Sequence, residues 1–182
     1  MIPARLPRRS GGFASRRINR APSPLLVRAV PWLTVMLASL LPAWPYIATA
    51  PLLPPLGFLV LIGWQQIRPG LLPIWAGLPL GVFDDIYSGQ PFGSAVLLWS
   101  LAMIALDVLE ARFPWRNFLL DWVAAAALIV IYILATMLFA GANVPLIAIA
   151  PQLLLAVFLY PLVGRAVALF DRFRLLPLAR VR

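Results

Sequence analysis

The chain has 182 residues, of which 63% are hydrophobic and only 12% are charged. A soluble domain usually carries about 45–50% apolar and about 25% charged residues, so the composition excludes an ordinary soluble protein and places the chain in a bilayer. The formal net charge is +9, and cysteine and histidine are both absent from the sequence. Disulfides, thiolate metal ligands, imidazole ligands and a histidine general base are therefore excluded.

All fifteen basic residues are arginine, and most of them lie near the two ends of the chain. Seven fall within residues 1–28 and five within residues 165–182, which leaves only Arg68, Arg112 and Arg116 between them. Because these arginines flank apolar segments rather than forming a basic stripe with aromatic residues, we expect them to meet anionic lipids and predict no nucleic acid partner.

The first 27 residues are rich in Arg, Pro and Ser and contain no acidic residue. Such a stretch buries too little apolar surface to order itself, so we predict that residues 1–27 form a disordered cytoplasmic tail. A cleaved signal peptide is disfavoured because the following apolar segment is too long, whereas a mitochondrial transit peptide remains an alternative. Residues 28–170 are predicted to form the membrane domain, and residues 171–182 a second basic cytoplasmic tail.

Six apolar segments follow the basic tail. A helix needs roughly 20 apolar residues to cross a hydrocarbon core about 30 Å thick, and the third segment offers only 13 residues. Pro42 and Pro45 interrupt the first segment, and Pro151 and Pro161 are expected to kink the sixth. The predicted segments are 30–50, 51–67, 71–83, 92–109, 118–140 and 144–170.

Charge decides whether the short third segment crosses the membrane. If all six segments cross and the N-terminal tail is cytoplasmic, all fifteen arginines lie on the cytoplasmic side, as the positive-inside bias requires. If the third segment does not cross, the arginines after Arg68 move to the outside and the bias disappears. The sequence therefore predicts an all-α membrane protein: a compact bundle of about six transmembrane helices, some short or Pro-kinked, with both termini cytoplasmic.

The most unusual run of residues lies between the third and fourth segments. Asp84 and Asp85 end the third segment, and Gly89, Pro91 and Gly93 supply residues typical of a turn. One interpretation is a polar structural turn, and another is a carboxylate pair for proteolysis, cation binding or proton relay. Adjacent side chains on a helix point about 100° apart, and hard cations need more oxygen ligands than this run provides. We therefore predict no catalytic residue and no metal site.

A second set of charged residues surrounds the junction of the fourth and fifth segments. Asp107 and Glu110 are three residues apart and share a helix face, with Arg112 and Arg116 close by in sequence. Asp121 falls in the first turn of the fifth segment, where a negative charge interacts favourably with the helix dipole. This pattern indicates an interfacial ion-pair cluster, and the functional alternative is a cytoplasmic docking patch.

Aromatic residues occur near many predicted segment ends. Trp and Tyr at such positions usually anchor a membrane protein in the head-group region, so no stacked cofactor is needed to explain them, and we predict none. The residues expected to act in this way are Trp32, Trp64, Trp75, Tyr87, Trp115 and Trp122.

The run with the two aspartates also resembles a known family. The matching residues are Gly81, Asp84, Asp85, Gly89, Pro91 and Gly93, followed by Ser94-Ala-Val-Leu-Leu-Trp99. This pattern is similar to the signature of the rod shape-determining membrane protein MreD family, and the similarity extends over about residues 51–121. The motif residues are therefore candidates for partner binding or for a structural role.

The resemblance implies a non-enzymatic scaffold of the bacterial cell-elongation machinery, in the inner membrane, that acts in peptidoglycan synthesis. The partners it implies are an MreC-like protein and, indirectly, the MreB filament, the glycosyltransferase RodA and a class B penicillin-binding protein. It also implies a fold similar to the substrate-binding components of vitamin transporters, which is an analogy of fold alone. Two alternatives remain: a component that binds or transports a small molecule, because Pro-broken helices often build such sites, and an intramembrane hydrolase that uses Asp84 or Asp85.

Overall fold

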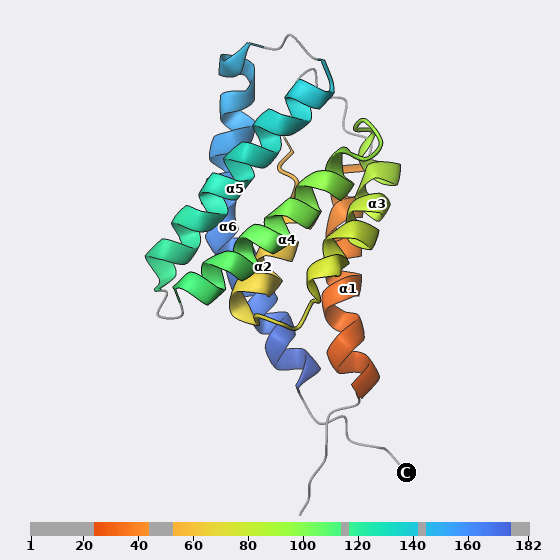
Figure 1. Cartoon of the computed structure of the whole chain (residues 1–182), viewed down its shortest axis with the longest axis vertical. Coiled ribbons are helices and arrows are strands. Elements are labelled where there is room, and N and C mark those ends of the chain that lie inside the picture. The colour runs from red at the N-terminus through yellow and green to blue at the C-terminus, as the bar shows by residue number, and fades with distance from the viewer. Residues whose placement is uncertain (1–23, 44–52, 114–116, 142–144, 176–182) are drawn as a thin grey trace, which may run out of the picture.

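The structure is a computed structural model that describes residues 24–43, 53–113, 117–141 and 145–175. Within these ranges the chain is helical, with six α-helices and no strand, which confirms the predicted all-α bundle (Figure 1). The α-helices are α1 (Pro24–Leu40), α2 (Leu56–Ile67), α3 (Gly77–Ser88), α4 (Ser94–Arg112), α5 (Phe118–Phe139) and α6 (Leu146–Arg174). Two short 3-10 helices, η1 (Leu41–Ala43) and η2 (Ile74–Ala76), follow α1 and precede α3.

Successive helices alternate in direction along the long axis of the molecule (Figure 1). The start of α1, the turn between α2 and α3 and the end of α6 therefore lie at the same end of the bundle. We call this the basic end because most of the described arginines lie there, and we call the other the far end. The arginines of the basic end are Arg28, Arg68, Arg112, Arg172 and Arg174, whereas Arg165 lies earlier on α6.

The helices differ widely in length. Three of them, α4, α5 and α6, are long and apolar enough to cross a membrane, with 19, 22 and 29 residues respectively. By contrast, α2 and α3 have 12 residues each, which corresponds to about 18 Å at 1.5 Å per residue. Eight of the 12 residues of α2 are buried, so its neighbours cover the backbone of this short helix. The expected short helices are thus present.

Several boundaries differ from those predicted: α2 begins at Leu56 and α3 at Gly77, although the predicted segments began at 51 and 71. The third helix ends at Ser88, so Asp84 and Asp85 lie inside it and not in a loop after it. The first helix already begins at Pro24, within the segment assigned to the basic tail. The last helix continues four residues beyond position 170, to Arg174. In the third and sixth helices, polar residues extend the helix because tertiary contacts satisfy the side chains of Asp85, Asp171 and Arg174, which hydropathy alone does not report.

Aromatic side chains fill the centre of the bundle. Phe58 of α2 stacks on Tyr132 of α5, with ring centroids 4.3 Å apart, and also meets Trp99 of α4 at 6.0 Å. On one side of this core, α3 and α4 approach closely at Gly81, which has no side chain. A Cβ at this position would lie only 2.6 Å from the Cα of Val96, so only glycine fits. Small residues allow this close approach, which is a common way for membrane helices to gain packing contacts.

The alternating helix directions generate a prediction about topology. Because the chain has no native cysteine, the variants Pro69→Cys, Leu175→Cys and Ala140→Cys would each carry a single thiol at an exposed position. We expect an impermeant thiol reagent to reach positions 69 and 175 only from the cytoplasmic side, and position 140 only from the opposite side. Labelling of positions 69 and 175 from opposite faces of the membrane would contradict the six-crossing arrangement.

Candidate functional site

The carboxylate of Asp85 accepts hydrogen bonds from the backbone at the start of the next helix, α4. Its two oxygens accept hydrogen bonds from the backbone N–H groups of Gly93 at 2.8 Å and Ala95 at 2.9 Å. Weaker contacts at 3.3 Å come from the Ser94 hydroxyl and the Val96 N–H. The first turn of a helix has no internal partner for its N–H groups, and its dipole favours a negative charge. Asp85 of α3 is therefore the cap of α4.

The other motif residues shape the short connection between α3 and α4. Gly89 ends α3 with a φ of 69°, and Gly93 precedes α4 with a φ of 95°, a left-handed region that glycine adopts at little cost. Between them, the carbonyl of Pro91 accepts a hydrogen bond from the Ser94 N–H at 3.0 Å. The spacing of the motif thus produces a turn that returns the backbone to the Asp85 carboxylate.

Asp84 points to a different part of the bundle from its neighbour. It is only 7% exposed, and its carboxyl group lies near the side chains of Ser39 on α1 and Tyr132 on α5. The Tyr132 hydroxyl also donates to the amide oxygen of Gln90 in the turn, at 3.3 Å. Asp84 therefore joins three helices at the far end, whereas Asp85 caps a fourth. Among the described residues, no group of three or more acidic side chains is placed to hold a metal ion.

The predicted charge cluster lies at the basic end of α4 and α5. Asp107 and Arg112 are exposed and Glu110 is half-buried, while Arg116 lies outside the described residues. Asp121 lies in the first turn of α5, and its backbone carbonyl accepts a hydrogen bond from the Gln66 amide at 2.9 Å. The side-chain cap of α5 is Asn117, whose oxygen accepts from the Leu120 N–H at 3.0 Å. The docking role of this cluster stays a prediction.

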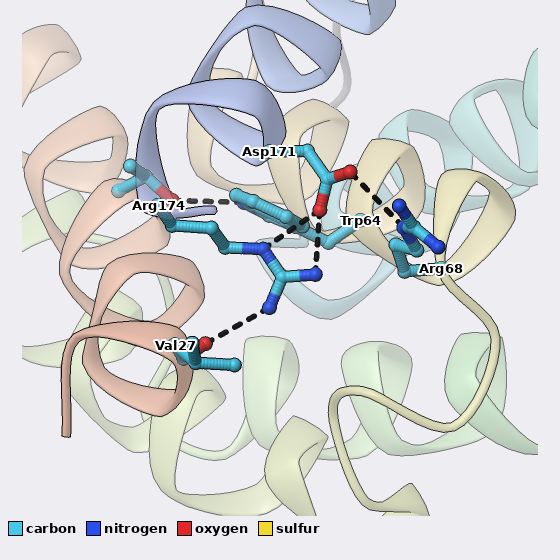
Figure 2. A network of polar contacts seen from close by, with 6 residues as sticks. Val27, Trp64, Arg68, Asp171 and Arg174 are labelled. Carbon is cyan, nitrogen blue, oxygen red and sulfur yellow. Dashed lines mark hydrogen bonds and ion pairs between the residues drawn. The ribbon is translucent and has the colours of Figure 1, made fainter. Parts of the chain in front are cut away.

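A second polar site lies at the basic end, where α1, α2 and α6 meet (Figure 2). Arg174 is only 7% exposed, and its Nε donates to Asp171 Oδ1 at 2.7 Å. The same guanidinium group donates to the Val27 carbonyl at 3.0 Å and lies 5.5 Å from the ring centre of Trp64. Arg68 donates to the other oxygen of Asp171 at 3.0 Å. We call these five residues the Arg174 latch.

Pro31 explains why the latch reaches the backbone of α1. Proline has no N–H, so Pro31 inside α1 leaves the carbonyl of Val27, four residues earlier, without its helical donor. The Arg174 guanidinium supplies that donor. An equivalent arrangement occurs on α6, where Pro161 deprives the Val157 carbonyl of its partner and the Trp122 ring N–H donates to it at 3.2 Å. Neighbouring helices thus replace the hydrogen bonds that proline removes.

The latch was missed by the sequence analysis. Asp171 and Arg174 were assigned to a basic tail, and Trp64 was expected to anchor in the head-group region, yet Trp64 is fully buried. Its ring N–H donates to the Thr34 hydroxyl at 2.8 Å, which brings α2 against α1. The available signal was a helical proline together with an Asp and an Arg three residues apart, but sequence does not say which carbonyl lies beside which guanidinium.

The cap generates a prediction about stability. Asp85→Ala removes the acceptor of several buried N–H groups, and each unsatisfied group costs about 1–3 kcal/mol. We therefore expect a clear loss of thermal stability in detergent, and a smaller loss for Asp85→Asn, which keeps one acceptor oxygen. Ser88→Ala, at an exposed position on the same turn, is the matched control. Equal melting temperatures for Asp85→Ala and Ser88→Ala would exclude the cap as a stabilising element.

The latch generates a second prediction, for which the chain provides its own control. Arg174→Gln leaves Asp171 short of one buried partner, a change that costs about 3–5 kcal/mol when a buried pair is broken. Arg172→Gln removes the same charge from an exposed site two residues away and should cost less than about 0.5 kcal/mol. Thermal unfolding of the purified variants measures the difference, and equal losses would contradict the latch.

A second substitution separates the two hydrogen-bonded contacts of Arg174, the one with Asp171 and the one with the Val27 carbonyl. Pro31→Ala supplies the missing backbone N–H for the Val27 carbonyl, so it should restore about 1 kcal/mol in the Arg174→Gln background. It should not restore the part of the loss that comes from Asp171. If Pro31→Ala has the same effect with and without Arg174, the guanidinium group does not replace the helical donor.

Comparison with known proteins identifies the family of the chain. No curated protein and no solved structure matches the chain. A family model described as rod shape-determining protein MreD matches residues 24–171, a longer region than the 51–121 in which the resemblance was recognised from the motif. The match runs from the first residue of α1 to Asp171 of the latch and covers most of the chain, so this protein belongs to the MreD family.

Proposed function

We propose that this MreD-family protein is a non-enzymatic scaffold of the cell-elongation complex in the bacterial inner membrane. It would control rod shape by holding an MreC-like partner during peptidoglycan synthesis, with both of its termini in the cytoplasm. The observation that carries the proposal is the family match over residues 24–171, since the family description is a role in rod shape. Three helices able to cross a membrane support the location.

The burial and bonding of the two motif carboxylates support a non-enzymatic role. Asp85 is occupied as the cap of α4, and Asp84 lies near side chains of two other helices. Both side chains are buried, at 5% and 7% exposure, so neither is presented to a substrate at the surface. The Asp85 carboxylate is a poor general acid or nucleophile, because reaction would break the hydrogen bonds that hold the start of α4.

The placement of the polar bonds supports a scaffold in particular. The cap joins α3 to α4 at the far end, and the latch joins α6 to α1 and α2 at the basic end. Between them, fully buried aromatic side chains such as Phe58 and Trp99 fill the described core. A bundle held at both ends keeps its outer surfaces in fixed relative positions, which is what simultaneous binding of several partners requires. A filled core does not favour the small-molecule alternative.

The proposed partners fall into two groups. An MreC-like protein is the direct partner, and the MreB filament, RodA and a class B penicillin-binding protein are reached through it. Anionic lipids are the second group, because Arg28 and Arg172 are exposed at the basic end, where each arginine gains about 1 kcal/mol near an anionic surface. The exposed carboxylate of Asp107 makes the α4–α5 corner a candidate docking patch.

Depletion of the protein in its host tests the proposed function. We expect rod-shaped cells to become round, and the wall-synthesis complex to disperse, because the partners lose their common anchor. A plasmid copy of the natural sequence should restore the rods. Affinity purification in mild detergent, with mass spectrometry, should recover the MreC-like partner. Unchanged cell shape together with an intact complex after depletion would refute the proposal.

A further inference from the structure

The last three residues of α3 and the connection to α4, residues 86–93, expose apolar side chains and no charge. We call this stretch the turn between α3 and α4. Ile86 is 61% exposed, Tyr87 48% and Phe92 77%, although the turn connects two helices at the end of the bundle. Residues 86–93 contain no charged residue, and the two carboxylates that precede them are buried. A loop in water normally presents polar side chains, so this composition calls for an apolar environment around the turn.

The backbone amides at the start of α4 need no water. At the start of α4, the N–H groups of residues 93, 95 and 96 donate to Asp85. The N–H of Ser94 donates to the Pro91 carbonyl at 3.0 Å, and the N–H of Leu97 donates to the Gly93 carbonyl at 3.0 Å. All five amides at this helix end thus have protein acceptors. Internal pairing of amides such as these favours placing a helix end in a hydrocarbon region.

Helix length places the turn below the membrane surface. Trp75 is 64% exposed and lies 5.7 Å from Trp32, and this pair of rings is suited to the head-group region on the side of the basic end. From there, η2 and α3 rise by about 24 Å, since a 3-10 helix rises about 2.0 Å and an α-helix about 1.5 Å per residue. The hydrocarbon core is about 30 Å thick, and any helix tilt shortens the reach.

The rest of the bundle extends farther in the same direction. Figure 1 shows the outer ends of α5 and α6 well beyond the turn between α3 and α4 along the long axis. The α3 side of the molecule is thus shorter than the α5–α6 side. A bilayer whose thickness matches the longer α5–α6 side therefore extends beyond the turn.

We propose that the turn of residues 86–93 is immersed in the membrane leaflet at the far end, where Ile86, Tyr87 and Phe92 contact lipid acyl chains. The partner of this surface is the lipid itself, and Asp85 makes the immersion possible because it satisfies the backbone amides of the turn. The inference concerns how the protein sits in the bilayer, and it does not rest on the proposed role in cell shape.

Spin labels at single cysteines test the depth of the turn, because the chain has no native cysteine. Phe92→Cys is the test site, Ile131→Cys in the middle of α5 is the deep reference, and Ala140→Cys at the end of α5 is the shallow reference; all three positions are exposed. The purified labelled protein is placed in vesicles of phosphatidylethanolamine and phosphatidylglycerol. Collisions with oxygen and with a water-soluble nickel complex are then measured for each label.

We expect the nickel collision rate at position 92 to fall severalfold below that at position 140 and to approach the rate at position 131. A rate at position 92 equal to that at position 140 would overturn the proposal. Protection in native membranes but not in the purified vesicles would also overturn it, because a protein would then be the covering partner. If Phe92→Cys lowers the melting temperature, Ile86→Cys is an equivalent test site with its own exposed side chain.

Discussion

A chain in hydrocarbon must find a protein partner for every backbone N–H and C=O group, and this constraint organises the whole bundle. It is most demanding where the helix pattern is broken. Pro31 and Pro161 each leave a carbonyl without its donor, and the donors that replace it come from other helices: Arg174 for Val27 and Trp122 for Val157. The start of α4 leaves amides without acceptors, and Asp85 of α3 supplies them. The breaks in the helices are therefore the points at which the helices are tied together.

This view explains why the two aspartates of the family signature are buried inside the bundle. Asp84 and Asp85 are adjacent in sequence but point to different helices, so one caps α4 while the other joins α1, α3 and α5. Gly81 is needed for the close contact of α3 with α4. These buried motif residues thus have a structural role in the fold.

The arginines have two separate physical roles at the basic end. Arg28 and Arg172 are exposed, as the proposed contact of arginines with anionic head groups requires. Arg174 is buried and connects three helices. Its planar guanidinium group contacts the Asp171 carboxylate, the Val27 carbonyl and the Trp64 ring at the same time. Residues two positions apart on one helix thus differ in function because one faces the bundle and the other faces away from it.

Composition, hydropathy and the distribution of arginine were sufficient to predict a membrane bundle of about six helices, some of them short, because these properties depend on local sequence and on transfer from water to lipid. The motif was sufficient to recognise the family, which residues 24–171 match. The end of α3 at Ser88, the burial of Trp64 and the Arg174 latch could not be predicted in this way. They depend on which side chain meets which broken backbone position, as with Val27 and Arg174, which are 147 residues apart. Only the packing of the helices brings such groups together, since a free carbonyl in one helix places no requirement on the sequence of the helix that satisfies it.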